Sequence, residues 1–230
     1  MSWGDNYGRL TSGTHSGGNS ESAVYDLNGN FTSLTRAGVR AETLNYTYAS
    51  GTNRIEYLKS NGVQKNFAHN NDGTMSTDGL RGLNIAYNSL KYPKSVSNSS
   101  STITYIYDAV GNKLAVLQDG VKKNIYCGEF VYDANLGVDY ILTPVGQMTN
   151  NSGTFTPQFN ITDHLGNVRS VVNSSGAVLQ NTDYYPFGLA FADNNVTTNR
   201  YLFNGKELEN YTLGTTYLGT PYPVQHISAN

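Results

Sequence analysis

Hydrophobic and polar residues alternate with a period of two along most of this chain. The runs LNYTY (residues 44–48), LNIAYN (83–88) and TITYIY (102–107) each place Leu, Ile or Tyr on one face and mainly Asn or Thr on the other. Such alternation of β-branched and aromatic residues with polar ones is typical of half-buried β-strands. No segment shows a sustained helical period with caps, so we predict an all-β fold with at most one turn of helix.

Short turn signals separate these runs at regular intervals. Asn-Gly and Asp-Gly pairs between alternating segments are the strongest short-range signal for a β-hairpin. The signals lie at Asn28-Gly29, Asn61-Gly62, Asp72-Gly73, Asp119-Gly120, Gly166-Asn167, Ser175-Gly176 and Asn204-Gly205. The chain is therefore predicted to be a series of tandem β-hairpins in an antiparallel sheet.

Two of the predicted hairpins share a sequence template. The segments YDLNGNFTSLTRAG (residues 25–38) and YDAVGNKLAVLQDG (107–120) have equal length and coincide at only a few positions. The coincident residues are Tyr25, Asp26, Gly29, Asn30 and Gly38 in the first, and Tyr107, Asp108, Gly111, Asn112 and Gly120 in the second. Repetition of one hairpin unit indicates a solenoid-like or spirally wound sheet.

Backbone geometry explains why these positions are shared. An Asp at the first position of a type I turn accepts hydrogen bonds from backbone N–H groups two residues further on. The Gly three residues after it adopts a positive φ at no steric cost. The Tyr before the Asp ends the incoming strand, where its ring packs against neighbouring strands.

Three other segments carry the template in altered form. HNNDGT (residues 69–74) has Asn in the Asp position, and DHLGNVRSVVNSSG (163–176) keeps D-x-x-G-N with one extra residue before the return Gly. YDANLG (132–137) keeps Tyr-Asp, but its Gly is shifted by one position.

Composition narrows the function classes. The formal net charge is -2 and only 14% of residues are charged, against about a quarter in an average protein. Nothing therefore attracts the chain to nucleic acid or to an anionic membrane. Of the hydrophobic residues, 18 are Tyr, which suits broad sheets better than a thick globular core.

The sequence contains no pattern that predicts catalysis or metal binding. Cys127 is the only cysteine, so neither an internal disulfide nor a thiolate metal site can form. The histidines have no ligand spacing; they are His15, His69, His164 and His226. No apolar run approaches the ~20 residues that span a membrane, and no signal peptide is visible. We expect no enzyme activity, catalytic residue, metal or cofactor.

Three clusters of residues could suggest chemistry or binding, but each has a simpler structural interpretation. Asp163-His164 could form an acid–base pair, but adjacent residues point apart and turn capping explains the Asp. Lys206-Glu207 is interpreted as an exposed ion pair beside a turn, with little effect on stability. The aromatic residues of Tyr184–Gly188 could stack on sugars, but packing over a turn is favoured. Arg169 is expected to be a strand residue.

Tyr25-Asp26, Gly29-Asn30, Tyr107-Asp108 and Gly111-Asn112 resemble the Y-D-x-x-G-N motif of the RHS/YD-repeat family. Three further blocks resemble the RHS repeat-associated core of bacterial members: DHLGNVRSVV (163–172), DYYPFGLAF (183–191) and RYLFNGKELEN (200–210). The core positions carried over are Asp163, His164, Gly166, Asn167, Arg169, Tyr185, Pro186, Phe187, Gly188, Asn204, Gly205, Lys206 and Glu207.

The resemblance implies an organisation and a role. Residues 1–24 are expected to form a loop-rich N-terminal segment, 25–145 degenerate YD-repeat hairpins, 146–210 a core-like region and 211–230 an atypical tail. In the family, the repeats wind into a hollow β-shell that encloses a C-terminal toxin, and the core seals one end. The chain is thus expected to be a non-enzymatic part of such a shell, secreted or at the cell surface. Its partners would be the rest of the shell and an enclosed toxin segment.

The end of the sequence departs from the family pattern. Many members cleave themselves at an Asp-Pro element after the core, but this chain contains no Asp-Pro dipeptide. We expect the tail to be truncated or altered, and carry over neither autoproteolysis nor toxin activity. Two alternatives stay open: a cell-surface module whose Asn- and Tyr-rich face binds glycans or a protein, and a degraded gene fragment without activity.

Overall fold

The computed structural model describes residues 3–15, 17–190, 199–209, 211, 213, 216–217 and 220–221. Within these ranges the secondary structure is β-strand apart from one 3-10 turn, η1 (Phe203–Gly205), which confirms the all-β prediction. None of the described segments contains a helix of the length and apolarity needed to cross a membrane. The chain forms two compact units: unit 1 comprises Met1–Leu83 and Asp183–Phe191, and unit 2 comprises Asn84–Thr182 and Ala192–Asn230.

Unit 1 contains a seven-stranded antiparallel sheet in which each strand pairs with its neighbours in sequence, so that β1 and β7 form its open edges. Its strands are β1 (Trp3–Gly4), β2 (Leu10–Thr14), β3 (Ser20–Tyr25), β4 (Phe31–Ala37), β5 (Glu42–Tyr48), β6 (Ile55–Ser60) and β7 (Val63–Asn66). A hairpin of β8 (Ala68–His69) and β9 (Met75–Asp78) follows.

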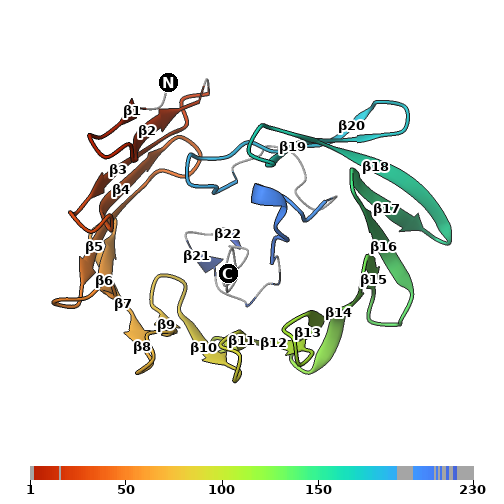
Figure 1. Cartoon of the computed structure of the whole chain (residues 1–230), viewed down its shortest axis with the longest axis horizontal. Helices are drawn as coiled ribbons and strands as arrows, with labels where there is room; N and C mark the ends of the chain where they lie inside the picture. Colours follow the sequence, from red (N-terminus) through yellow and green to blue (C-terminus); the bar gives the residue numbers. More distant parts are fainter. Residues whose placement is uncertain are drawn as a thin grey trace. The chain divides into compact units, whose positions relative to one another are not determined.

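Unit 2 contains strands β10 to β20 of a second sheet, which again pair in chain order and antiparallel. Its strands are β10 (Leu83–Tyr87), β11 (Pro93–Ser97), β12 (Thr102–Tyr107), β13 (Lys113–Gln118), β14 (Val121–Cys127), β15 (Phe130–Tyr132), β16 (Val138–Thr143), β17 (Gly146–Asn151), β18 (Thr154–Thr162), β19 (Val168–Asn173) and β20 (Val178–Asn181). A short pair, β21 (Thr216–Tyr217) and β22 (Thr220–Pro221), lies near the end. The β10–β20 sheet is curved, with the segment before β21 on its concave side (Figure 1).

The alternating residues line up across neighbouring strands. In unit 1, Ala23 pairs with Leu34 and Leu34 with Leu44, and all three are buried in one cluster. Directly opposed residues share one face of a sheet. One apolar row therefore crosses β3, β4 and β5, as the period of two requires.

Unit 2 has an equivalent row. Ile85 pairs with Val96, and Val96 pairs with Ile103. Two residues further along β12, Tyr105 pairs with Val116 of β13. All five residues are buried. The face predicted from the alternation in TITYIY is thus the buried face of β12.

The first 24 residues differ from the loop that we predicted. They contain β1, β2 and most of β3. The sequence of β2, LTSGT, is too polar and Gly-rich to indicate a strand, but Gly13 is needed there for close packing. A Cβ at Gly13 would lie 2.5 Å from Cγ of Pro186. A local sequence pattern cannot predict this contact, because Pro186 is remote from β2 in the sequence.

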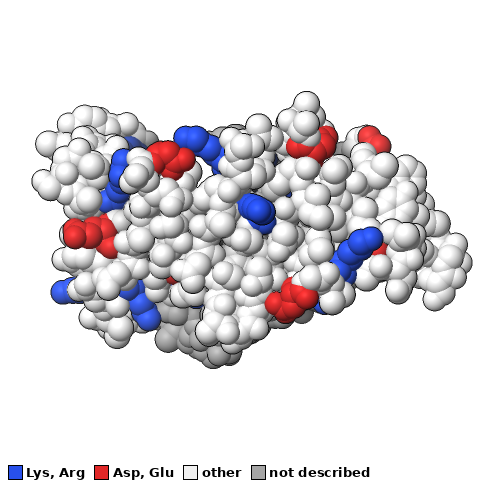
Figure 2. All heavy atoms as spheres, turned by 90° about the horizontal axis from the view of Figure 1, so that it is seen from below, with Lys and Arg blue, Asp and Glu red and all other residues white. Residues whose placement is uncertain are grey.

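The two units also divide the chain differently from the predicted segments. Residues 183–191 belong to unit 1, although strands β10–β20 precede them in the sequence. The predicted core-like region therefore contributes to both units. Charged side chains are scattered among neutral ones on the face in Figure 2, where no patch of a single sign dominates.

Ile103 and Ile106 provide a test of one-sided burial. Both lie on β12, but Ile103 is fully buried, whereas Ile106 is 44% exposed. We expect Ile103→Ala to lower the free energy of unfolding by about 2–5 kcal/mol through lost burial and cavity formation. Ile106→Ala should change it by less than about 0.5 kcal/mol. Denaturant melts of the two variants measure the difference, and equal losses would contradict the assignment of faces.

Candidate functional site

The Y-D-x-x-G-N motif forms a closed turn between β3 and β4. The Asp26 N–H donates to Asn30 O (2.9 Å), and the Gly29 N–H donates to Asp26 O (3.2 Å). Asp26 Oδ1 accepts the N–H groups of Asn28 and Asn30, both at 2.9 Å. Gly29 has a φ of 87°. These contacts confirm the predicted roles of Asp and Gly.

The Asn of the motif has a role that the sequence analysis missed. Asn30 Nδ2 donates to Asp26 Oδ2 (2.9 Å), and Asn112 and Asn167 make the same contact with Asp108 and Asp163. The Asn30 side chain and the backbone N–H groups of the turn hold the pKa of Asp26 below its ordinary value. A fully bonded carboxylate therefore closes each turn.

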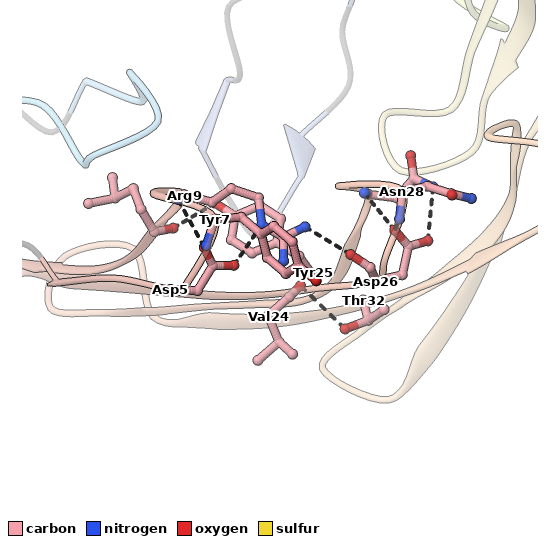
Figure 3. A network of polar contacts seen from close by, with 10 residues as sticks. Asp5, Tyr7, Arg9, Val24, Tyr25, Asp26, Asn28 and Thr32 are labelled. Atoms are coloured by element: carbon pink, nitrogen blue, oxygen red, sulfur yellow. Dashed lines mark hydrogen bonds and ion pairs between the residues drawn. The ribbon is translucent and has the colours of Figure 1, made fainter.

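Neighbouring turns of unit 1 are joined by an arginine (Figure 3). Arg9 Nε pairs with Asp5 Oδ2 (2.6 Å) in the turn between β1 and β2, and Arg9 Nη1 donates to Asp26 O (2.8 Å). The guanidinium lies 4.6 Å from the centre of the Tyr25 ring, and the Tyr25 hydroxyl donates to Leu10 O (2.6 Å). The Tyr of the motif thus contributes a cation–π contact and a hydrogen bond to the preceding strand.

The second repeat packs its Tyr differently. The ring centres of Tyr107 and Tyr92 are 5.4 Å apart. Gly111 has a φ of 95°, and a Cβ there would lie 2.4 Å from Cε2 of Tyr92. Gly111 is therefore required both by the turn and by the neighbouring ring.

YDANLG forms the same turn, and its Gly is shifted by one position relative to the other copies, as the sequence indicates. The Asp133 N–H donates to Gly137 O (2.9 Å), and Asp133 Oδ1 accepts the N–H groups of Asn135 and Gly137. Leu136 occupies the position that Gly holds in the other copies, with a φ of 67°. The turn therefore forms although a residue with a Cβ is strained at this position.

The first core segment, residues 183–190, is a turn that docks on the sheet of unit 1. The Gly188 N–H donates to Tyr185 O (2.8 Å), and Gly188 has a φ of 88°. The Tyr185 side chain is 1% exposed. Its hydroxyl donates to Ala37 O (2.9 Å) and accepts the Arg40 N–H (3.1 Å). The aromatic residues of this segment therefore belong to the turn itself, and they pack on the sheet.

A buried carboxylate ties this segment to β3. Glu21 Oε2 accepts the Phe187 N–H (2.9 Å), while Glu21 Oε1 pairs with Arg36 Nε (2.6 Å). Arg36 also pairs with the buried Glu42. Burial lowers the pKa of Arg36, but the two carboxylates outweigh this and hold it above its ordinary value. The Phe187 ring meets Phe31 edge-on, with ring centres 5.0 Å apart.

The second core segment, residues 199–209, is anchored by the D-x-x-G-N turn at Asp163. Asn167 donates through Nδ2 to Asp163 and accepts the Asn204 N–H at Oδ1 (2.9 Å). The Val168 N–H donates to Leu202 O (3.1 Å). The motif that closes the turn between β18 and β19 therefore also holds the turn that contains Gly205.

A partly buried ion cluster fixes the other end of this segment. Lys113 Nζ, on β13, pairs with Glu207 Oε2 (2.7 Å) and Glu209 Oε1 (2.9 Å). Burial lowers the pKa of Lys113, but the two carboxylates outweigh it and raise that pKa above its ordinary value. The Tyr126 hydroxyl donates to Glu207 Oε1 (2.9 Å). Our interpretation of Lys206-Glu207 as an exposed pair is wrong, because Glu207 turns inward to a partner remote in sequence.

Further contacts extend the anchoring across the sheet. Asn124 Oδ1, buried on β14, accepts hydrogen bonds from Arg200 Nη1 (3.1 Å) and the Tyr211 hydroxyl (2.7 Å). The Asn98 amide, between β11 and β12, donates to Leu213 O. Burial raises the pKa of Tyr211 to about 12, so this hydroxyl stays protonated at neutral pH.

The other predicted core residues have simpler positions. His164 and Lys206 are exposed, and Gly166 takes a φ of 81° in its turn. Arg169 lies half-buried on β19. Burial raises the pKa of Asp163, but the hydrogen bonds from Asn167 and Leu165 outweigh it and hold that pKa below its ordinary value, and the charge of Arg169 adds to the lowering. No group of His, Cys, Asp and Glu within the described ranges could hold a metal ion.

These residues define two antiparallel meanders, and each meander carries one docked core segment. No protein-family model and no curated protein matches the chain. Two solved structures are similar: a Photorhabdus luminescens Tc holotoxin pore with a mutant TccC3, and TcdB2-TccC3 without its hypervariable C-terminal region. Each is 14% identical. The first match covers 95% of this chain with a TM-score of 0.57, and the second 90% with a TM-score of 0.54. The chain spans 14% of the length of each, and the likeness concerns the fold.

Leu136 offers a stabilising substitution. Because a residue with a Cβ is strained at a φ of 67°, Leu136→Gly should raise the free energy of unfolding by about 1 kcal/mol. Leu165 is equally exposed in the turn of Asp163 but does not have a positive φ. Leu165→Gly should therefore be neutral or destabilising. Thermal melts compare the two variants, and a loss of stability in Leu136→Gly would refute the strain argument.

The shifted pKa of Glu209 predicts that the stability of the fold depends on pH. Burial raises the pKa of Glu209 above its ordinary value of 4.5, although Lys113 acts in the opposite direction. The folded state therefore binds the proton more tightly than the unfolded state, and this stabilisation is lost as pH rises through the raised pKa. Glu209→Gln mimics the protonated carboxyl. Its stability relative to the wild type should increase from pH 4 to pH 7.

Chemical denaturation across this range measures the effect. Glu129→Gln, at an exposed position between β14 and β15, serves as the control and should show no such trend. A stability difference between Glu209→Gln and the wild type that stays constant with pH would contradict the prediction.

Proposed function

We propose that this chain is a non-enzymatic structural part of an RHS/YD-repeat shell that encloses or presents a toxin or effector segment. The observation that carries the proposal is the contact between a repeat hairpin and the core. Lys113, which directly follows the second copy of the repeat motif, pairs with Glu207 and Glu209 of the second core segment. Repeat and core therefore form one structural unit.

The polar groups of the core support a structural role. Asp163 is fully engaged in its turn, while Glu207 and Glu209 pair with Lys113. Partly buried carboxylates with such partners fix the position of a segment, because each would lose its compensation if the partner were removed.

The similar structures give the proposal its biological setting. One of them is a Tc holotoxin pore, and the other is TcdB2-TccC3 without the region described as hypervariable and C-terminal. A meander that matches a seventh of such a chain suits a section of a larger shell wall. Its partners would be further repeats along the open sheet edges and a segment beyond the core. A secreted or surface location follows from this role.

Protease protection of the segment beyond the core tests the proposal. The native gene product that carries this sequence is purified and treated with a broad-specificity protease, and the fragments are mapped by mass spectrometry. We expect that segment to be cleaved at least tenfold more slowly than after denaturation. In Tyr185→Ala and Glu207→Ala, where a core segment loses its anchor, protection should decrease.

Val110→Ala is the matched control, because Val110 is exposed at a turn and its truncation should leave protection unchanged. Rapid cleavage of the downstream segment in the folded wild type would overturn the shell proposal. Images of single particles without an enclosed volume would overturn it as well.

A further inference from the structure

The sheet of unit 2 has apolar side chains on both of its faces between β14 and β20. Tyr126 contacts Glu207 of the second core segment and lies opposite Val131, which is buried. The next opposed pair, Cys127 and Phe130, points to the other face, because successive side chains of a strand alternate. We call this other face, on the convex side of the curved sheet, the outer face of unit 2 (Figure 1).

Apolar residues continue along the outer face from one strand to the next. Phe130 lies opposite Ile141, and Ile141 lies opposite Met148. Met148 in turn lies opposite Pro157 of β18. Directly opposed residues share one face of a sheet, so this row runs from β15 to β18, and Cys127 extends it to β14.

A second apolar row begins on β18. Phe159 lies opposite Val172, and Val172 lies opposite Val178 on β20 at the edge of the sheet. Phe155 and Ile161 share the outer face with Phe159, since an even number of residues separates them on the same strand. All of these residues except Val172 are exposed. The outer face therefore presents large apolar side chains to water.

The two rows of the outer face contain no charged residue. A partner with a different surface is usually selected by complementary charges, which these rows do not provide. In a contact between two copies each patch meets itself, so any charge would face its own copy and repel it. Aromatic and Met side chains without charges are also typical of the core of an interface between subunits. The rows therefore suit a second copy of this chain.

The outer face is large enough for such a contact. Strands ~4.8 Å apart make it about 29 Å wide from β14 to β20, and it is about 20 Å long from Phe155 to Ile161. The resulting area of roughly 600 Å² is at the upper end of the patches that monomers expose. It approaches the ~800 Å² that each partner contributes to a standard interface. Because the sheet is curved, two copies would meet mainly along its middle strands, and we expect a moderate affinity.

The sequence of β18 is complementary to itself in one orientation. Its outward residues are, in order, Phe155, Pro157, Phe159 and Ile161. An antiparallel contact with its twofold axis between Pro157 and Phe159 places these two residues of different copies opposite each other. The same axis places Phe155 of one copy opposite Ile161 of the second copy. Each contact then joins an aromatic ring to a smaller aliphatic side chain, which allows the two faces to interdigitate.

We propose that the outer face of unit 2 is an isologous interface for a second copy of this chain. The two β18 strands lie antiparallel across it, and the sheets are about 10 Å apart. The inference goes beyond the shell function and does not depend on it, because the interface lies on the face away from the second core segment.

Sedimentation velocity of the full chain tests the proposal. We expect a reversible equilibrium between monomer and dimer, with a dissociation constant in the micromolar range. The equilibrium should change little between low and high salt, since no charge lies in the rows and only exposed charges are screened. A chain that stays monomeric at every concentration up to about 0.5 mM, well above a micromolar dissociation constant, would overturn the proposal.

Charged variants locate the interface. Phe159→Glu introduces a charge that each copy would have to bury, and it should weaken association at least about a hundredfold. Val63→Glu is the matched control, because Val63 is an equally apolar, exposed strand residue on β7 in unit 1, and it should leave association unchanged. Circular dichroism establishes that each variant is folded. A dimer that is unaffected by Phe159→Glu would overturn the assignment to the outer face.

A mixing experiment tests the antiparallel orientation. Phe155→Glu and Ile161→Lys should each weaken association when measured alone, since each copy then buries an unpaired charge. In a mixture of the two variants, Glu at position 155 of one copy faces Lys at position 161 of the other. The mixture should therefore form a heterodimer at least about tenfold more tightly than either variant associates with itself. Equal association in the mixture and in the separate variants would overturn the antiparallel contact.

Cys127 provides an independent distance measurement. It is the only cysteine of the chain and is exposed, so a nitroxide label can be attached without any substitution. β14 lies about 19 Å from β18 across the sheet, and two labels in a dimer centred on β18 are therefore no more than about 40 Å apart. Double electron–electron resonance measures this separation, and a contact through the β20 edge would give a longer one. A separation well above about 40 Å would overturn the proposal.

Lipid is the other occupant that an uncharged apolar face could accept. Flotation of the chain with phosphatidylcholine vesicles distinguishes the two. Binding to vesicles by a chain that remains monomeric in solution would assign the outer face to lipid and overturn the proposal. Protease protection of a downstream segment is a separate measurement, so a monomeric chain would leave the shell proposal standing, and the reverse also holds.

Discussion

The architecture of this chain depends on one kind of turn. In it an aspartate caps the backbone, and the residue three positions later takes a positive φ. Adjacent antiparallel strands need a reversal that preserves their register, because a slip of one residue would move every apolar side chain to the other face. At Asp26, Asp108, Asp133 and Asp163 the carboxylate accepts two backbone N–H groups of its own turn. The register, and with it the buried row on each sheet, follows from these turns.

The core segments reuse this geometry for another purpose. Tyr185–Gly188 and Leu202–Gly205 make the same i to i+3 backbone bond, with Gly at positive φ. Neither turn joins two strands of the meander; each presents side chains to a sheet. The buried charge of Glu21 in unit 1 and the partly buried charge of Lys113 in unit 2 then decide where each segment docks. Because a charge that is removed from water without a partner is costly, such contacts select one docked position over its neighbours.

The sequence predicted those parts of the fold that depend on neighbours along the chain. The alternation in residues 83–87 and 102–107 gives the strands that the structure contains, and the Asp and Gly roles in the repeat are correct. Turns that lack the expected Gly were harder to predict. Leu136, for example, takes a positive φ that is unfavourable for a residue with a Cβ. The polar strand β2 was missed because its packing partner, Pro186, is distant in sequence.

Local physics thus determined the all-β class, the hairpin turns and the buried face of most strands, because these depend on backbone sterics and on the period of two. Only the tertiary structure decided what covers those faces. The partnership of Lys113 with Glu207 and Glu209, and that of Glu21 with Phe187, join positions with no shared local pattern. Such contacts arise when a folded sheet presents a buried charge to a segment that arrives later in the chain, and no spacing along the sequence encodes that encounter.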